Sequence, residues 1–142
     1  MLSKRAKYAL KALIALAAEP SGEPVRISDL ARQEQIPRKF LELILLDLRN
    51  KGILQSKKGK GGGYFLGQDP STVYVGQLIR QFDGPLAAVP CASQTAYARC
   101  VDCQDEAGCG VRWIMREVRD ATASILDRTT LADMVKHEKE FV

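Results

Sequence analysis

Apolar side chains recur at helical spacing near the start of the chain and predict a helix that ends at about Ala18. Its apolar stripe consists of Leu10, Leu13, Ile14 and Ala17, with basic side chains off the stripe. The basic start imitates a signal peptide, but Lys11 interrupts the apolar run. No run of 18 apolar residues occurs anywhere in the sequence, so we expect no membrane span and a cytoplasmic protein.

Two further helices follow with a short break between them. The second is predicted over residues 28–34, and Pro37 ends the intervening segment because the residue before a proline avoids helical geometry. The third is predicted from Arg38 to about Lys51, with Gly52 at its end. Its core positions are Phe40, Leu41, Ile44, Leu45 and Leu48. Helix, short break and helix at this spacing are typical of a helix-turn-helix.

Two short strand-like segments, 53–56 and 64–67, follow the third helix. Between them lies Lys57-Lys58-Gly59-Lys60-Gly61-Gly62-Gly63, in which lysine and glycine are the only residue types. Glycine permits positive φ angles and a close approach of the backbone to a surface. After a helix-turn-helix, such a hairpin is typical of a wing.

The second half of the sequence predicts a helix over residues 75–82, an aperiodic segment over 86–110 and a long helix over 111–127. One face of the long helix carries Val111, Ile114, Met115, Val118, Thr122 and Ile125. Since the other helices are needed for a small core, we expect this face to pair with a second copy rather than fold back on its own domain. The predicted fold is mainly α with a small β-hairpin wing. Its expected units are a winged helix-turn-helix (1–84), a cysteine-containing sensor loop (85–110) and a dimerisation helix with a C-terminal segment (111–142).

Charge is distributed unevenly over the 142 residues. Residues 1–64 hold 13 basic and 6 acidic side chains, a net charge of +7, whereas residues 65–142 have a net charge of −3. A basic helix-turn-helix and wing favour double-stranded DNA as a partner. The predicted contacts are Arg38, Lys39 and Glu42 in the third helix and Lys57, Lys58 and Lys60 in the wing. Glu42 is suited to accept a hydrogen bond from a cytosine amino group, and the lysines are suited to phosphates. Neither a P-loop nor a complete dinucleotide-binding pattern accompanies the glycines.

The four cysteines are confined to nineteen residues, with the spacing C-x8-C-x2-C-x5-C: Cys91, Cys100, Cys103 and Cys109. Four thiolates suit an iron–sulfur cluster or zinc, so all four are candidate ligands. A thiol redox switch using Cys100 and Cys103 is an alternative, as are simple buried cysteines. The same pair suggests a thiol–disulfide oxidoreductase, but no βαβ pattern surrounds it and we expect no enzyme. A zinc-stabilised interaction module is a further alternative. His137, the one histidine, is expected at the surface.

Several of these segments together resemble bacterial winged-helix regulators of the type represented by the iron–sulfur cluster regulator and the nitric-oxide-sensing repressor. The resemblance covers nearly the whole chain. The matching segments are Tyr8-Ala9-Leu10, Ile27-Ser28-Asp29-Leu30-Ala31, Ile36-Pro37-Arg38-Lys39-Phe40-Leu41-Glu42, Leu48-Arg49-Asn50-Lys51-Gly52, the wing Ser56–Tyr64, Trp113 and Thr130-Leu131-Ala132-Asp133-Met134.

The resemblance implies a homodimeric transcription factor that binds a palindromic operator and whose long helices cross at the interface. It also implies an iron–sulfur cluster near that interface in some members, on positions matched by Cys91, Cys103 and Cys109. Cys100 is an additional thiol, and Arg112 stands where iron–sulfur cluster regulators often have histidine. The fourth ligand is then Cys100, or the cluster has an open or non-protein ligand. Some relatives use no metal, which keeps a thiol switch as an alternative. The signal expected on these grounds is redox, iron or nitric oxide state.

Overall fold

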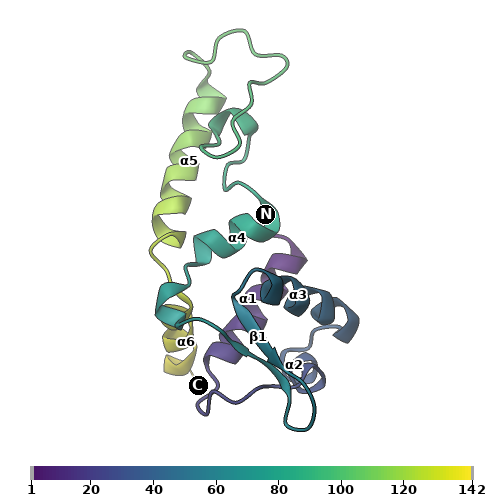
Figure 1. The fold of residues 1–142 in the computed structure, drawn as a ribbon. Coiled ribbons are helices and arrows are strands. Elements are labelled where there is room, and N and C mark those ends of the chain that lie inside the picture. The colour runs from purple at the N-terminus through teal and green to yellow at the C-terminus, as the bar shows by residue number, and fades with distance from the viewer. Residues whose placement is uncertain (1, 142) are drawn as a thin grey trace.

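The computed structural model describes residues 2–141, and its arrangement is mainly helical (Figure 1). Within this range the elements are α1 (Lys4–Ala17), α2 (Ile27–Glu34), α3 (Arg38–Asn50), β1 (Leu54–Lys57), β2 (Gly63–Leu66), the 3-10 turn η1 (Pro70–Thr72), α4 (Val75–Asp83), the 3-10 turn η2 (Pro90–Ala92), α5 (Gly110–Leu126) and α6 (Leu131–Glu140). The predicted winged helix-turn-helix is confirmed. No helix in this part of the chain is long and apolar enough to cross a membrane.

The core forms where the apolar stripes of the first helices meet. In α3, Leu41, Ile44, Leu45 and Leu48 are each 0% exposed, at the positions expected from helical spacing. Phe40 is half-buried and meets Tyr8 of α1 edge to face, with ring centroids 5.5 Å apart. Burial of leucines of this size contributes about 1.5–3 kcal/mol each, so this helix is fixed firmly to the domain.

The ends of α2 and α3 are set by two residues with positive φ. Gln35 has φ +55° and turns the chain from α2 into the break before α3. Gly52 has φ +79°, and the N–H groups of Gly52 and Ile53 donate to the carbonyls of Arg49 and Leu48. These two hydrogen bonds form a Schellman motif, which ends α3 and directs the chain into the wing.

The wing is the antiparallel hairpin of β1 and β2 with its connection, residues 54–66, in which Leu54 pairs with Leu66 and Lys57 with Gly63. The hairpin is also joined to the segment before α2, since Val25 and Tyr64 exchange backbone hydrogen bonds of 2.8 and 2.9 Å. A Cβ at Gly63 would lie 2.2 Å from the carbonyl oxygen of Val25. Only glycine therefore fits where the wing passes this segment.

The C-terminal part of the chain divides into a helix that leaves the core and a helix that returns to it (Figure 1). No residue of α5 is buried, whereas Leu131 and Val135 of α6 belong to the core beside α1. A capping box between Thr130 and Asp133 begins α6. The sequence patterns predicted α5 but not α6, which packs beside α1.

Candidate nucleic-acid interface and cysteine site

The outward face of α3 brings together the side chains predicted to contact DNA. Arg38, Lys39 and Glu42 are all exposed on the face opposite the buried leucines. Arg38 Nε donates to Glu42 Oε1 over 3.3 Å, an exposed pair of the kind that contributes about 0.3–0.5 kcal/mol. Because this pair is weak, Glu42 is readily released to accept from another donor.

The lysines of the wing are equally open to solvent. Lys57, Lys58 and Lys60 are exposed around the hairpin tip. Within the wing, Ser56 Oγ of β1 accepts a hydrogen bond of 3.2 Å from Arg49 Nη1 of α3. Arg49 was not among the predicted contacts, although it falls two helical turns after Glu42, on the same face. This hydrogen bond holds the wing beside the C-terminal end of the exposed α3 face.

The four cysteines line one pocket of about 530 Å³ at the N-terminal end of α5. Cys91 belongs to η2 and is buried, Cys109 is the N-cap of α5, and Cys100 and Cys103 lie in the irregular loop between them. Asp102, Asp105 and Arg112 also line this pocket. Among residues 2–141, no three side chains of histidine, cysteine, aspartate or glutamate are placed closely enough to hold a metal ion. The thiol donor set is nevertheless the one that iron–sulfur clusters use.

The two thiols in contact are Cys91 and Cys100. Cys100 Sγ donates to Cys91 Sγ at 3.7 Å, whereas the spacing had suggested Cys100 and Cys103 as a redox pair. This hydrogen bond, with partial burial and the nearby Asp102 carboxylate, raises the pKa of the Cys100 thiol. A higher pKa favours the neutral thiol over the thiolate, and the thiolate is the more nucleophilic form.

Two arginines of α5 fix the segment that carries Cys91. Arg112 Nε donates to the carbonyl of Cys91 over 3.0 Å, and Arg119 Nη1 donates to the carbonyl of Ala92 over 2.6 Å. The side chain of Arg119 is only 11% exposed. The sequence did not predict these hydrogen bonds. The only sign of them in the sequence is that two arginines lie two helical turns apart on α5, which does not indicate what they bind. The segment that carries Cys91 is thus held against α5, whose N-cap is Cys109.

A side-chain contact spans the loop that carries Cys100 and Cys103. The Tyr97 hydroxyl, before Cys100, donates to the Glu106 carboxylate, after Cys103. This hydrogen bond to a carboxylate is the main cause that raises the pKa of Tyr97, so the phenol stays protonated. The contact joins the two halves of the loop that carries Cys100 and Cys103.

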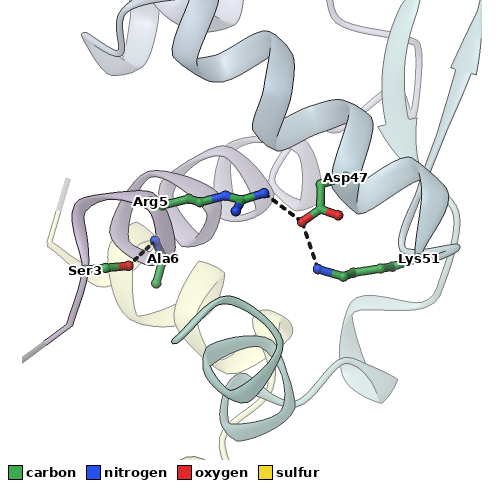
Figure 2. A network of polar contacts seen from close by, with 5 residues as sticks. All are labelled: Ser3, Arg5, Ala6, Asp47 and Lys51. Atoms are coloured by element: carbon green, nitrogen blue, oxygen red, sulfur yellow. Dashed lines mark hydrogen bonds and ion pairs between the residues drawn. The ribbon is translucent and has the colours of Figure 1, made fainter. Parts of the chain in front are cut away.

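Polar contacts also connect α4, which precedes the cysteine loop, with α1 and α3. Figure 2 shows Asp47 of α3 accepting from Arg5 of α1 over 3.0 Å and from Lys51 over 2.8 Å. Both cations lie over the ring of Phe82 near the end of α4, at 5.4 and 4.8 Å from its centroid. The neighbouring Asp83 accepts from Ser3 Oγ and, over 2.9 Å, from the Ser3 N–H. The end of α4 is therefore fastened to the start of α1 and to α3.

The outer face of α5 remains uncovered. Val111, Ile114, Val118 and Ile125, predicted to lie on one stripe, are 63, 41, 47 and 54% exposed. Met115 and Thr122 of the same stripe are half-buried. His137, which was predicted to lie at the surface, is exposed. Its ring packs against that of Phe141, with the ring centroids 4.7 Å apart.

Comparisons with known proteins agree on the family. The family model Rrf2, described as iron-dependent transcriptional regulator, matches residues 2–137. A putative HTH-type transcriptional regulator rrf2-like from Rhodobacter capsulatus is 43% identical over 138 residues, covering 95% of this chain and 92% of the relative. The structure of CymR, the global cysteine regulator of B. subtilis, has a TM-score of 0.80 at 28% identity, covering 96% of this chain and 97% of CymR.

A second solved structure with a similar fold is that of an IscR protein. T. potens IscR has a TM-score of 0.75 at 26% identity, covering 99% of this chain and 89% of IscR. The family model and the Rhodobacter relative are named as transcriptional regulators and not as enzymes, in agreement with the expectation from the sequence. The chain belongs to the Rrf2 family of transcriptional regulators.

Proposed function

We propose that the protein is a homodimeric DNA-binding regulator that senses redox, iron or nitric oxide state through an iron–sulfur cluster held by its cysteines. The observation that carries this proposal is the position of the four thiols, which line one pocket directly before the uncovered helix α5. Because the proposed partner is chromosomal DNA, the proposed place of action is the cytoplasm.

The proposed DNA contacts follow from the exposed face of α3 and the wing. Arg38, Lys39 and Glu42 enter the major groove, where Glu42 accepts from a cytosine amino group. Lys57, Lys58 and Lys60 contact phosphates or the adjacent minor groove and add affinity with little sequence information. Two copies related by a twofold axis then read the two halves of a palindrome, with their α3 helices about 34 Å apart.

The residues proposed to hold the cluster are Cys91, Cys100, Cys103 and Cys109. When bound, such a cluster gains or loses electrons and reacts with iron-removing or nitrosating agents. Cys109 Sγ accepts the N–H of Arg112 over 3.4 Å, so the chemical state of this sulfur bears directly on the first turn of α5. Because Arg112 and Arg119 bind the carbonyls of Cys91 and Ala92, a shift of this turn would also move η2. We propose that the state of the cysteines thereby sets the placement of the paired α5 helices and the distance between the two DNA-contacting heads.

The test combines composition with DNA binding. Protein purified without oxygen is expected to be brown and to contain iron and sulfide. A colourless sample that contains zinc would contradict the proposed iron–sulfur cluster. Cluster-loaded and cluster-free protein are then compared for binding to a duplex that the protein selects from a random pool. Equal affinities would remove sensing from the proposal. Single Cys→Ser variants identify the ligands through loss of visible absorption, with Ser93→Ala as a control beside Cys91.

A second candidate is a cluster-free thiol switch, favoured by the contact of Cys91 with Cys100. Peroxide oxidation would join the two sulfurs, releasing two protons and two electrons to the oxidant, which is reduced to water. The Cys91→Ser and Cys100→Ser variants would both lose peroxide-dependent DNA binding. A response that survives in both variants excludes this pair.

A further inference from the structure

Two large apolar side chains stand uncovered on α3. Leu43 is 64% exposed and Leu46 is 42% exposed. The core positions of the same helix are already filled by four fully buried side chains. Leu43 and Leu46 therefore lie outside the core of the domain, and the exposed part of each side chain is open to a further contact.

Their place on the helix puts them among the predicted DNA contacts. Residues three or four apart are neighbours on a helix surface. Leu43 therefore lies one turn after Lys39, Leu46 lies one turn after Glu42, and the two leucines adjoin each other. The apolar strip formed by Leu43 and Leu46 is thus enclosed by charged groups rather than set apart from them.

The charges around the strip indicate what covers it. Arg38, Lys39 and Arg49 on α3 and the lysines of the wing complement a polyanion. The uncovered stripe proposed for pairing of two copies lies on α5, a different element. Nucleic acid is the occupant that satisfies the basic groups and the apolar strip at once.

We propose that Leu43, supported by Leu46, recognises the 5-methyl group of thymine beside the base pair contacted by Glu42. In the major groove only thymine presents a methyl group, and apolar side chains are its usual partners. Each half-site should then contain a thymine next to the cytosine that Glu42 reads. This inference rests on the proposed DNA-binding function and adds a specificity-determining residue to it.

Deoxyuridine provides the test, because it differs from thymidine only by the methyl group. Full-length protein, purified without oxygen, selects duplexes from a random pool, and each thymine of the enriched duplex is replaced in turn. Wild-type protein should bind about four-fold more weakly when the thymine beside the cytosine is replaced, as expected for about 0.8 kcal/mol per buried methyl-sized group.

The variants separate direct contact from a general effect. Leu43→Ala should bind the thymine duplex about four-fold more weakly than wild type and should no longer distinguish deoxyuridine at that position. Leu46→Ala should reduce the discrimination partially. Leu2→Ala removes another exposed leucine, 46% exposed and outside α3, and should behave as wild type. Circular dichroism melting should show all three variants folded, since the replaced side chains lie outside the core.

Each remaining outcome counts against a defined statement. An enriched duplex that tolerates deoxyuridine at every thymine, or discrimination that survives in Leu43→Ala, overturns the role of Leu43 and leaves DNA binding intact. Loss of self-association in Leu43→Ala, measured by sedimentation, assigns the strip to a protein contact and also overturns it. If no duplex is enriched at all, the proposed function fails and this inference fails with it.

Discussion

Gly63 joins the wing to the rest of the domain at a point where no side chain fits. Its φ is +148°, and a Cβ would lie 2.2 Å from a backbone oxygen of Val25, which is well inside contact distance. Gly63→Ala is expected to shift the wing or break its bonds to Val25 and to cost about 1–3 kcal/mol of stability. DNA affinity should fall as well, because the wing lysines move.

Gly61 supplies the control for this prediction. It also has a positive φ, +74°, but a Cβ there would meet nothing within 4 Å. Gly61→Ala should therefore lower the free energy of unfolding by only about 1 kcal/mol, the cost of its backbone strain. Thermal unfolding and duplex binding measure both effects, and equal losses for the two variants would contradict the importance of the contact with Val25.

Asp47 accepts hydrogen bonds from cations on two elements, Arg5 on α1 and Lys51 after α3 (Figure 2). Its side chain is 29% exposed, against 52% for Asp29 in its ion pair with Arg32. Asp47→Ala is expected to lower the free energy of unfolding by about 1 kcal/mol, because it removes two partly exposed ion pairs. Asp29→Ala, which breaks the exposed pair with Arg32, should change it by less than about 0.5 kcal/mol. Urea unfolding measures the difference, and an equal effect of both variants would speak against a network at Asp47.

The sequence predicts residues well where a regular pattern decides their position. Leu41, Ile44, Leu45 and Leu48 are buried as their spacing indicates, because one helix can present only one face to the core. The thiol contact between Cys91 and Cys100 was not predictable in this way. Its Cys91 side lies in η2, where Arg112 and Arg119 bind the carbonyls of Cys91 and Ala92 from positions 21 and 27 residues away. No periodicity encodes such contacts between a helix and an irregular loop.

At the scale of elements, α4 and the end of α5 are joined by one bidentate ion pair. Arg80 donates to both carboxylate oxygens of Asp127, over 2.6 and 2.9 Å. The site has space for this contact because residue 76 is glycine: a Cβ at Gly76 would lie 1.9 Å from Asp127 Oδ1. This pair, together with the backbone contact of Val75 with Thr129, orients α5 relative to α4.

The pair predicts a dependence of stability on pH. The hydrogen bond from Arg80 lowers the pKa of Asp127 in the folded state below its ordinary value. The folded state then binds this proton less tightly than the unfolded state, so the stabilisation is present above about pH 4 and is lost as pH falls through the lowered pKa. The free energy of unfolding of the wild type should exceed that of Asp127→Asn by up to about 1 kcal/mol at neutral pH. The two free energies should become equal at acid pH.

The partner variant makes the assignment specific. Arg80→Gln should reproduce the behaviour of Asp127→Asn, since either change removes the same pair. Urea unfolding between pH 2 and 7 measures all three proteins. A difference between wild type and Asp127→Asn that persists unchanged at the acid end would show that the carboxylate stabilises the fold in another way.

The helix α6 shows where patterns fail for a whole element. Only Leu131 and Val135 of α6 are buried, and one pair at i and i+4 is too short a stripe to stand out in a sequence. Its capping box, Thr130 with Asp133, was the one signal that could have predicted it. By contrast, α5 carries a long apolar stripe and was predicted, although that stripe is uncovered within the chain. The periodicity identified the helix, and only the structure showed which helix belongs to the core.

At the scale of the whole molecule, the basic half of the sequence coincides with the exposed α3 face and the wing. Each lysine that neutralises a phosphate should add about 0.9 to the slope of log affinity against log salt concentration. Replacement of Lys57, Lys58 and Lys60 by alanine should therefore lower the slope by roughly 0.9 for each phosphate that is no longer neutralised. Lys136 and Lys139 on α6 provide a control of equal chemistry away from the wing, and their replacement should leave the slope unchanged. Fluorescence anisotropy across salt concentrations decides between these outcomes.

The proposed pairing of two copies through α5 gives a last prediction, at the scale of the whole molecule. Ile114 and Val118 adjoin each other on the uncovered stripe, and neither belongs to the core of one copy. Replacement of both by glutamate should therefore prevent pairing without unfolding the chain, because burying two carboxylates in an apolar interface is strongly unfavourable. Sedimentation should show a monomer with an unchanged circular dichroism spectrum. Affinity for a palindromic duplex should fall by about tenfold or more, since the second head loses the high effective concentration that the linkage provides. Ser124→Glu, exposed on α5 but off this stripe, should leave the dimer intact, and a double variant that still sediments as a dimer would place the interface elsewhere.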